Sequence, residues 1–104
     1  MIEALKQLLG VKSETDLAAL LAEGAQIVDV RSPEEFRTGH VKGSLNIPLS
    51  NLERSLSKLK RNKPVIVCCA SGMRSAQAKS ILQSKGFERV YNAGSWQSLK
   101  NFCG

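Results

Sequence analysis

One cysteine in this sequence stands where it could become a nucleophile. Cys69 follows an apolar run and precedes a short segment made of Ala70, Ser71, Gly72, Met73 and Arg74. A thiol attacks as its thiolate, and its pKa falls at a helix N-terminus or beside a cation. The small residues would let backbone amides surround an anion, and Arg74 adds a permanent positive charge. The pattern favours a reactive Cys69 over an inert, buried one.

The elements around Cys69 are predicted to bring it to the edge of a sheet. Residues 64–69 (PVIVCC) are the most apolar run, and their β-branched content favours a central parallel strand. A helix is expected after Arg74, passing through Ala76 and Leu82 and ending at Gly86. Sites in parallel sheets lie at the carboxyl ends of strands, which is where Cys69 falls.

The remaining cysteines and the histidine are predicted to have structural roles. Cys68 is adjacent to Cys69 on a strand, so it points to the opposite face and is expected to pack. His40 is the only histidine and lies in a turn, so a Cys, His and Asp triad is not expected. Because Cys68, Cys69 and Cys103 have neither a disulfide pattern nor zinc-ligand spacing, we expect no metal site.

Helices and strands are predicted to alternate along the rest of the chain. Ser32, Pro33 and Glu35 supply an N-cap, a first-turn proline and a capping-box acid. Helices are expected at 13–24, 32–39, 50–62 and 94–102, and strands at 26–31, 44–47 and 89–92. This alternation predicts one α/β domain over residues 1–104, with a mostly parallel sheet between helices.

The composition limits the classes of function. The chain has 104 residues, 42% of them hydrophobic and 23% charged, as in one soluble domain. Its formal charge of +6 could favour nucleic acid, but no aromatic residue is interleaved among the basic residues at 58–63, so nucleic acid is not an expected partner. Residues 1–10 lack a signal-peptide pattern and no run is long enough to span a membrane, so a cytoplasmic location without a membrane partner is expected. The protein is expected to act as a monomer.

Three segments resemble signatures of the rhodanese family of single-domain sulfurtransferases, and the resemblance covers nearly the whole chain. Residues 27–31 (IVDVR) with 34–36 are similar to the family's first strand and the acidic-aromatic turn after it. Residues 39–48 (GHVKGSLNIP) are similar to its second signature, and residues 69–75 (CASGMRS) resemble its active-site loop. The resemblance implies a three-layer sandwich, with a central, mostly parallel sheet flanked by helices.

The resemblance also implies a two-step reaction without a cofactor. Cys69 would take a sulfane sulfur from a small donor, such as thiosulfate or another persulfide, and pass it from a Cys69 persulfide to a thiol, a protein acceptor or cyanide. Arg74 would steady anionic donors or leaving groups, while Asp29 and Arg31 would support the fold. Ala70 stands where some members that handle thiosulfate have a basic residue, which leaves the donor open. Trp96 is expected to pack beneath the loop.

Other interpretations of the same residues remain open. A rhodanese-like domain can be a non-catalytic regulatory or interaction module, although such domains commonly lose the nucleophile that this chain keeps. A phosphatase or arsenate reductase is disfavoured, because the related phosphatases have five residues between cysteine and arginine, whereas Cys69 and Arg74 enclose four. Cys103 could trap an oxidised or persulfidated Cys69 as a disulfide, but a tail cysteine without a role is the simpler interpretation.

Overall fold

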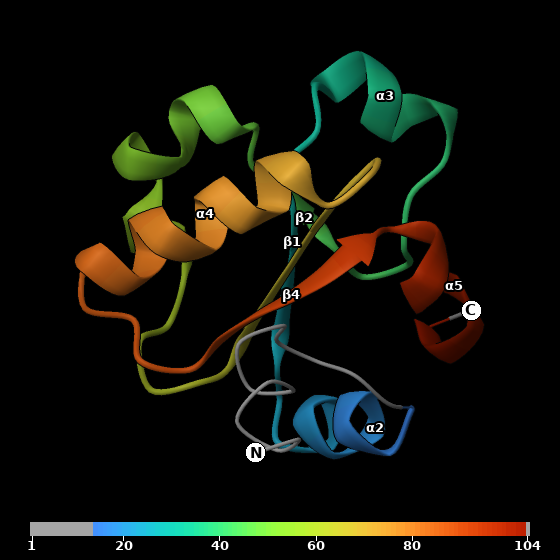
Figure 1. Cartoon of the computed structure of the whole chain (residues 1–104), viewed down its shortest axis with the longest axis horizontal. Helices are drawn as coiled ribbons and strands as arrows, with labels where there is room; N and C mark the ends of the chain where they lie inside the picture. The colour runs from blue at the N-terminus through green and yellow to red at the C-terminus, as the bar shows by residue number, and fades with distance from the viewer. Residues whose placement is uncertain (1–13, 104) are drawn as a thin grey trace.

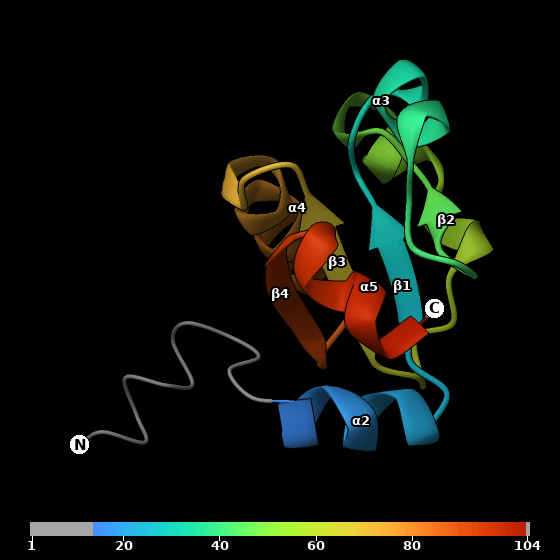
Figure 2. The same ribbon diagram turned by 90° about the vertical axis from the view of Figure 1, so that its right-hand side faces the viewer.

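The apolar run at 64–69 forms the interior of a parallel sheet, as its composition predicts. The computed structural model describes the backbone of residues 14–103 and the side chains of residues 17–100. Within them the sheet has four strands: β1 (Gln26–Asp29), β2 (Leu45–Asn46), β3 (Val65–Cys69) and β4 (Val90–Ser95). Their order is β2-β1-β3-β4 and each neighbouring pair is parallel (Figure 1 gives the whole chain, and Figure 2 labels all four strands). Cys69 therefore ends an inner strand, at the edge where parallel sheets form their sites.

Helices cover both faces of this sheet (Figures 1 and 2). They are α2 (Glu14–Ala22), α3 (Pro33–Thr38), α4 (Met73–Ser84) and α5 (Gln97–Cys103), with the 3-10 helices η1 (Leu49–Arg54) and η2 (Leu56–Lys58). One buried cluster joins the sheet to η1 and α4 through Leu52, Ala78 and Leu82. The other joins it to α2 and α5 through Leu17 and Leu99. The predicted three-layer α/β sandwich is confirmed.

Strand β3 contributes to both clusters, because successive side chains on a strand point to opposite faces. Val67 and Cys69 belong to the cluster beneath α4, whereas Ile66 and Cys68 belong to the cluster beneath α2 and α5. All five residues of the strand are buried. Cys68 is thus a packing residue on the face opposite Cys69, as predicted.

The prediction of a single helix at 50–62 is wrong. The chain forms η1 and then η2 instead, and Ser55 separates them with φ −116° and ψ 16°. Ser50 does not cap η1, which begins after Pro48 without a side-chain cap. Serines compete for backbone hydrogen bonds and weaken a helix, and the tight turns still bury the two leucines Leu52 and Leu59 against the sheet. Packing of the leucines therefore outweighs the helical period.

The other elements lie close to their predicted places. Ser32 and Glu35 form the predicted capping box: the Glu35 amide donates to Ser32 Oγ at 3.2 Å and the Ser32 amide to Glu35 Oε1 at 3.0 Å. Strand β4 runs farther than predicted, to Ser95, and the cap expected at Ser13 lies outside the described residues. Within the described part of the chain, no helix has both the length and the apolar character that crossing a membrane requires.

Candidate active site

The Cys69 sulfur lies inside a cradle of hydrogen-bond donors. The residue is fully buried at the end of β3, and its Sγ faces the first turn of α4. The Gly72 amide donates to Sγ at 2.9 Å, and the Ser75 amide donates at 3.4 Å. The Ser75 hydroxyl oxygen also lies 3.4 Å from Sγ. The predicted loop and helix therefore meet around one sulfur atom.

Gly72 makes this close approach possible. It is the N-cap of α4 and has φ +104°, a left-handed conformation that glycine adopts without steric cost. A Cβ at this position would lie 3.4 Å from the Cα of Gly94 on β4. The turn at Gly72 directs its N–H back towards Sγ, and the two residues before it, Ala70 and Ser71, are exposed. Both the sequence pattern and the geometry indicate that the loop needs small residues at 70–72.

The donors of the cradle stabilise a thiolate on Cys69. Burial by itself raises the pKa of the thiol, but hydrogen bonds from the Ser75 hydroxyl and amide, and from the amides of Gly72 and Ser71, outweigh burial. The pKa of Cys69 consequently lies below its ordinary value. Since the thiolate is the nucleophilic form, the site has the electrostatic character that the sequence predicts. Backbone and serine donors, rather than a basic side chain, produce most of this effect.

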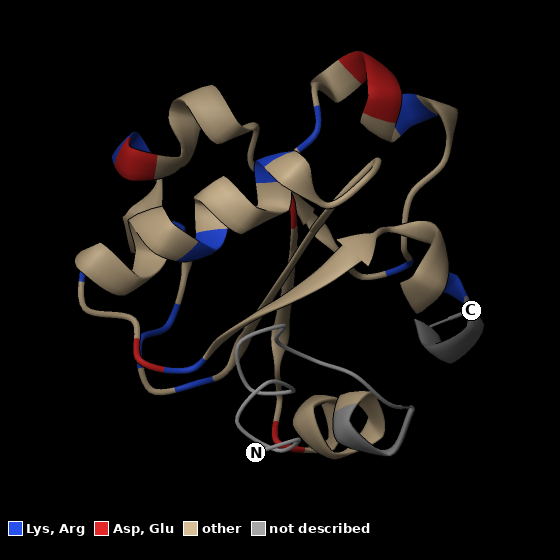
Figure 3. Ribbon diagram, viewed as in Figure 1, with Lys and Arg blue, Asp and Glu red and all other residues tan. Residues whose placement is uncertain are grey.

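Arg74 points to α3, where it forms a paired contact with Glu35. Its Nη1 lies 2.7 Å from Glu35 Oε1 and its Nη2 lies 3.0 Å from Oε2. The Arg74 guanidinium, followed by the Ser32 amide, lowers the pKa of Glu35 to about 2. The charges of α3 and of the first turn of α4 meet at the same end of the sheet (Figure 3). Glu35 therefore balances the positive charge of Arg74. The position of Arg74 in the sequence did not indicate this ion pair.

Glu35→Gln removes the ion pair with Arg74 but keeps the helix cap, because the glutamine side chain can still complete the capping box. The pKa of Glu35 lies at about 2, below its ordinary 4.5, so the pair stabilises the fold above pH about 4.5 and loses this effect as the pH falls towards about 2. Both side chains are more than one third exposed, so Glu35→Gln is expected to lower the free energy of unfolding at pH 7 by about 1 kcal/mol or less. Urea unfolding at pH 7, 4 and 2 measures the difference. A difference that persists unchanged at pH 2 would contradict the ion pair as its cause.

Asp29 and Arg31 form a buried pair at the end of β1. Arg31 Nη2 lies 2.8 Å from Asp29 Oδ2, and Nε lies 3.0 Å from both carboxylate oxygens. The same guanidinium donates to the carbonyls of Glu35 within α3 and of Gly39 just after it, at 3.3 Å and 2.7 Å, and so links the end of β1 to the α3 segment. These contacts fit the structural support expected of the pair.

The indole ring of Trp96 packs against the Arg31 guanidinium. The Arg31 guanidinium lies 4.6 Å from the centre of the indole, and the Lys100 ammonium lies 5.3 Å from it. The Trp96 amide donates to the Cys69 carbonyl at 2.8 Å, which fixes the end of β3. Gly39 faces the indole so closely that a Cβ there would lie 3.1 Å from it. The side chain is thus a packing residue, as predicted, but its indole packs on Arg31 and Gly39 and on the cluster beneath α2 and α5, not on the cluster that contains Cys69.

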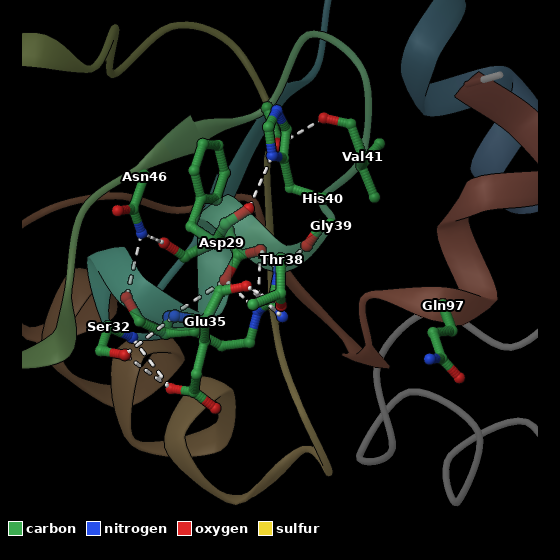
Figure 4. Close-up of polar contacts among 12 residues, drawn as sticks. Asp29, Ser32, Glu35, Thr38, Gly39, His40, Val41, Asn46 and Gln97 are labelled. Carbon is green, nitrogen blue, oxygen red and sulfur yellow. Dashed lines mark hydrogen bonds and ion pairs between the residues drawn. The ribbon is translucent and has the colours of Figure 1, made fainter.

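His40 lies in the turn after α3 (Figure 4). Its Nδ1 is 2.8 Å from the Phe36 carbonyl oxygen, and its ring stacks on the Phe36 ring with centroids 3.7 Å apart. These contacts fit the structural role that the sequence predicts. The side chain of Cys103 lies outside the described residues, so its redox role stays a prediction.

Two polar residues of the site, Ser75 and Asn92, were not assigned a role from the sequence. Ser75 belongs to the segment at 69–75 that resembles the family's active-site loop. Its position directly after Arg74, in the first turn of the expected helix, could have indicated a role in the site. Asn92 is on β4, with its Oδ1 2.6 Å from Ser75 Oγ. Nothing in the sequence near Cys69 indicates Asn92, because β4 joins the site only through the pairing of β3 with β4.

A buried cysteine at the end of an inner parallel strand, with its sulfur bound by amides of the next helix, defines an α/β domain with a cysteine site at the carboxyl edge of its sheet. The family model of the Rhodanese-like domain matches residues 13–101 of the chain. The chain therefore belongs to the rhodanese-like domain family, and the predicted family is confirmed.

Individual relatives agree with this assignment. Thiosulfate sulfurtransferase PspE of Escherichia coli (strain K12) is 38% identical over 74 residues, which cover 69% of this chain and 71% of PspE. The uncharacterized protein YqhL of Bacillus subtilis (strain 168) is 41% identical over 68 residues, covering 65% of this chain and 54% of YqhL, so the match spans about half of that relative. The structure of the human single-domain sulfurtransferase TSTD1 has a TM-score of 0.76 and 32% identity, and the match covers 89% of this chain and 96% of that one. In fold and family the chain is a rhodanese-like domain.

Proposed function

We propose that this protein transfers a sulfane sulfur through a persulfide on Cys69. The observation that carries the proposal is the cradle around Sγ, to which the Gly72 amide donates at 2.9 Å and the Ser75 amide at 3.4 Å, with the Ser75 hydroxyl oxygen also at 3.4 Å. A cradle of this kind stabilises a single anionic sulfur. The intact cradle also favours an enzyme over a non-catalytic module, and membership of the rhodanese-like family supports the same choice.

In the first step the Cys69 thiolate attacks the sulfane sulfur of the donor. A new S–S bond forms on Cys69 as the donor's own bond to that sulfur breaks. The leaving group takes the electron pair, as sulfite when the donor is thiosulfate or as a thiolate when the donor is another persulfide. Amides of the cradle that stabilised the thiolate remain in place for the anionic persulfide.

In the second step the acceptor attacks the outer sulfur of the persulfide. An acceptor thiolate or cyanide forms the new bond, and Cys69 leaves as the thiolate with the electron pair of the broken S–S bond. The Gly72 and Ser75 donors stabilise this leaving group, so the site returns to its starting state. The reaction needs no metal and no external oxidant, because the sulfur atom moves at the sulfane level from one nucleophile to the next.

The rim of the loop would meet both partners. Ala70 and Ser71 are exposed, and the side chain of Met73 is 74% exposed. Arg74 would attract anionic donors only in part, because Glu35 binds its guanidinium. We expect a small sulfur donor and a thiol or protein acceptor in the cytoplasm, with the protein acting as a monomer. The relative named thiosulfate sulfurtransferase supports thiosulfate as a donor, while Ala70 leaves room for other persulfides.

Intact-mass measurement after incubation with sulfur donors tests this function. The donors are thiosulfate, glutathione persulfide and cysteine persulfide, each supplied separately to the reduced protein. We expect the mass of one added sulfur atom with at least one donor, and its loss when cyanide or a thiol is added. Peptide mapping should place the sulfur on Cys69. If no donor adds sulfur to the folded protein, the proposed function is wrong.

A further inference from the structure

Asn92 on β4 connects three parts of the cysteine cradle. Its Oδ1 lies 2.6 Å from the Ser75 hydroxyl oxygen and accepts the Gly94 amide at 2.8 Å. Its Nδ2 donates to the Gly72 carbonyl at 3.4 Å. Through these contacts one carboxamide touches the loop that donates to Cys69, the first turn of α4 and the turn at the end of β4. Asn92 itself is half-buried and reaches the sulfur only through Ser75.

The Ser75 hydroxyl has one proton and three neighbours that could accept it. The shortest contact, 2.6 Å, is with Asn92 Oδ1, while the Gly72 carbonyl lies at 3.1 Å and Cys69 Sγ at 3.4 Å. When the proton points to Asn92, the Ser75 oxygen can only accept, and it then suits a Cys69 thiol that donates its S–H. When Cys69 ionises, the hydroxyl can help the thiolate only by turning away from Asn92.

We propose that Asn92 is a positioning residue that controls the ionisation of Cys69 by competing for the Ser75 proton. The thiol is favoured while Asn92 Oδ1 holds that proton, and the thiolate gains a donor when the proton turns to sulfur. The amides of Gly72 and Ser75 donate in both cases, so Asn92 adjusts the acidity of Cys69 rather than creating it. The inference rests on the proposed function in one respect, namely that Cys69 is the nucleophile.

Asn92→Ala neither adds nor removes a charged group near Cys69. Arg74 stays paired with Glu35, and the buried Asp29 and Arg31 stay paired at the end of β1. The other described charged side chains of the neighbouring helices are Glu34 and Arg37 on α3, Glu53 and Arg54 on η1, Lys79 on α4 and Lys100 on α5. An effect of Asn92 on Cys69 must therefore travel through Ser75 or the loop backbone, and a double-mutant cycle separates these two routes.

The test measures the pKa of Cys69 from the pH dependence of its alkylation by iodoacetamide, in a Cys68→Ala, Cys103→Ala background. Asn92→Ala is expected to lower this pKa by about half a unit to one unit, because the Ser75 proton becomes available to the thiolate. Ser75→Ala is expected to raise it. Once Ser75 is alanine, adding Asn92→Ala should change the pKa no further. Equal shifts in both backgrounds, or no shift from Asn92→Ala, would overturn the proposal.

Asn92→Asp provides a second test should the alanine variant fold poorly. The carboxylate can keep the contacts to Ser75 and Gly94 and holds the Ser75 proton more strongly, so we expect the pKa of Cys69 to rise by about one to two units. The added charge alone would act in either background, so the rise must be larger with Ser75 than with alanine there. An equal rise in both would overturn the proposal. Alkylation requires no sulfur donor, so these results are independent of whether a persulfide forms.

Discussion

Cys69→Ser is expected to abolish persulfide formation and to lower sulfur transfer by about 10³-fold or more, because serine offers no sulfur to carry the group and is a far weaker nucleophile. The protein should remain folded. A serine oxygen is smaller than sulfur and can accept the hydrogen bonds of the Gly72 and Ser75 amides that point into the cradle. Intact mass after donor treatment measures persulfide formation, thiol-acceptor kinetics measure transfer, and thermal unfolding checks the fold.

Cys68→Ala is the matched control for that variant. Cys68 is the next residue on the same buried strand, but its side chain belongs to the cluster on the opposite face of the sheet. Its loss should reduce stability by about 1 kcal/mol through a small cavity and leave sulfur transfer within about twofold. If Cys69→Ser still gained sulfur while Cys68→Ala did not, Cys68 would be the sulfur carrier and the assignment of the two cysteines would be reversed.

Local signals in the sequence sufficed for the elements that hold the cysteine. The apolar composition of 64–69 fixes a buried strand regardless of its partners, and the strand period then separates the two cysteines. The capping box of Ser32 and Glu35 is also local, since both partners lie within one helical turn. Small residues before α4 predict the loop, because few other residues allow amides to turn inward.

Contacts between distant segments could not be derived in this way. Glu35 and Arg74 are 39 positions apart, and Ser75 and Asn92 are 17 positions apart. Both pairs form only because parallel strands bring the ends of β1, β3 and β4 to one edge. The charge of Arg74 was visible in the sequence, but its neutralisation by Glu35 was not. The same limit explains why the single helix predicted at 50–62 does not form. There, packing of the leucines against the sheet outweighs the local helical period of the sequence.

The greatest loss of stability is expected from Arg31→Met. The side chains of Arg31 and Asp29 are only 4% and 0% exposed, so the variant leaves the Asp29 carboxylate buried without its cation. The carbonyls of Glu35 and Gly39 also lose their donor. Breaking a buried pair on one side costs about 3–5 kcal/mol, a large part of the stability of a domain of this size. Methionine keeps much of the packing on Trp96, so lost charge and hydrogen bonds dominate the effect. Urea unfolding at pH 7 measures it.

Arg89→Met makes the same chemical change in an exposed pair. Arg89 contacts Glu23 at 2.7 Å and 3.0 Å, nearly the same distances as in the buried pair, but these side chains are 45% and 46% exposed. Water can solvate Glu23 once Arg89 is gone, so only a small shift of the urea midpoint is expected. The contrast between the two variants tests the contribution of burial, because each removes an arginine from a carboxylate that it contacts at a similar distance. Comparable losses in both variants would contradict burial as the reason that Arg31 strongly supports the end of β1.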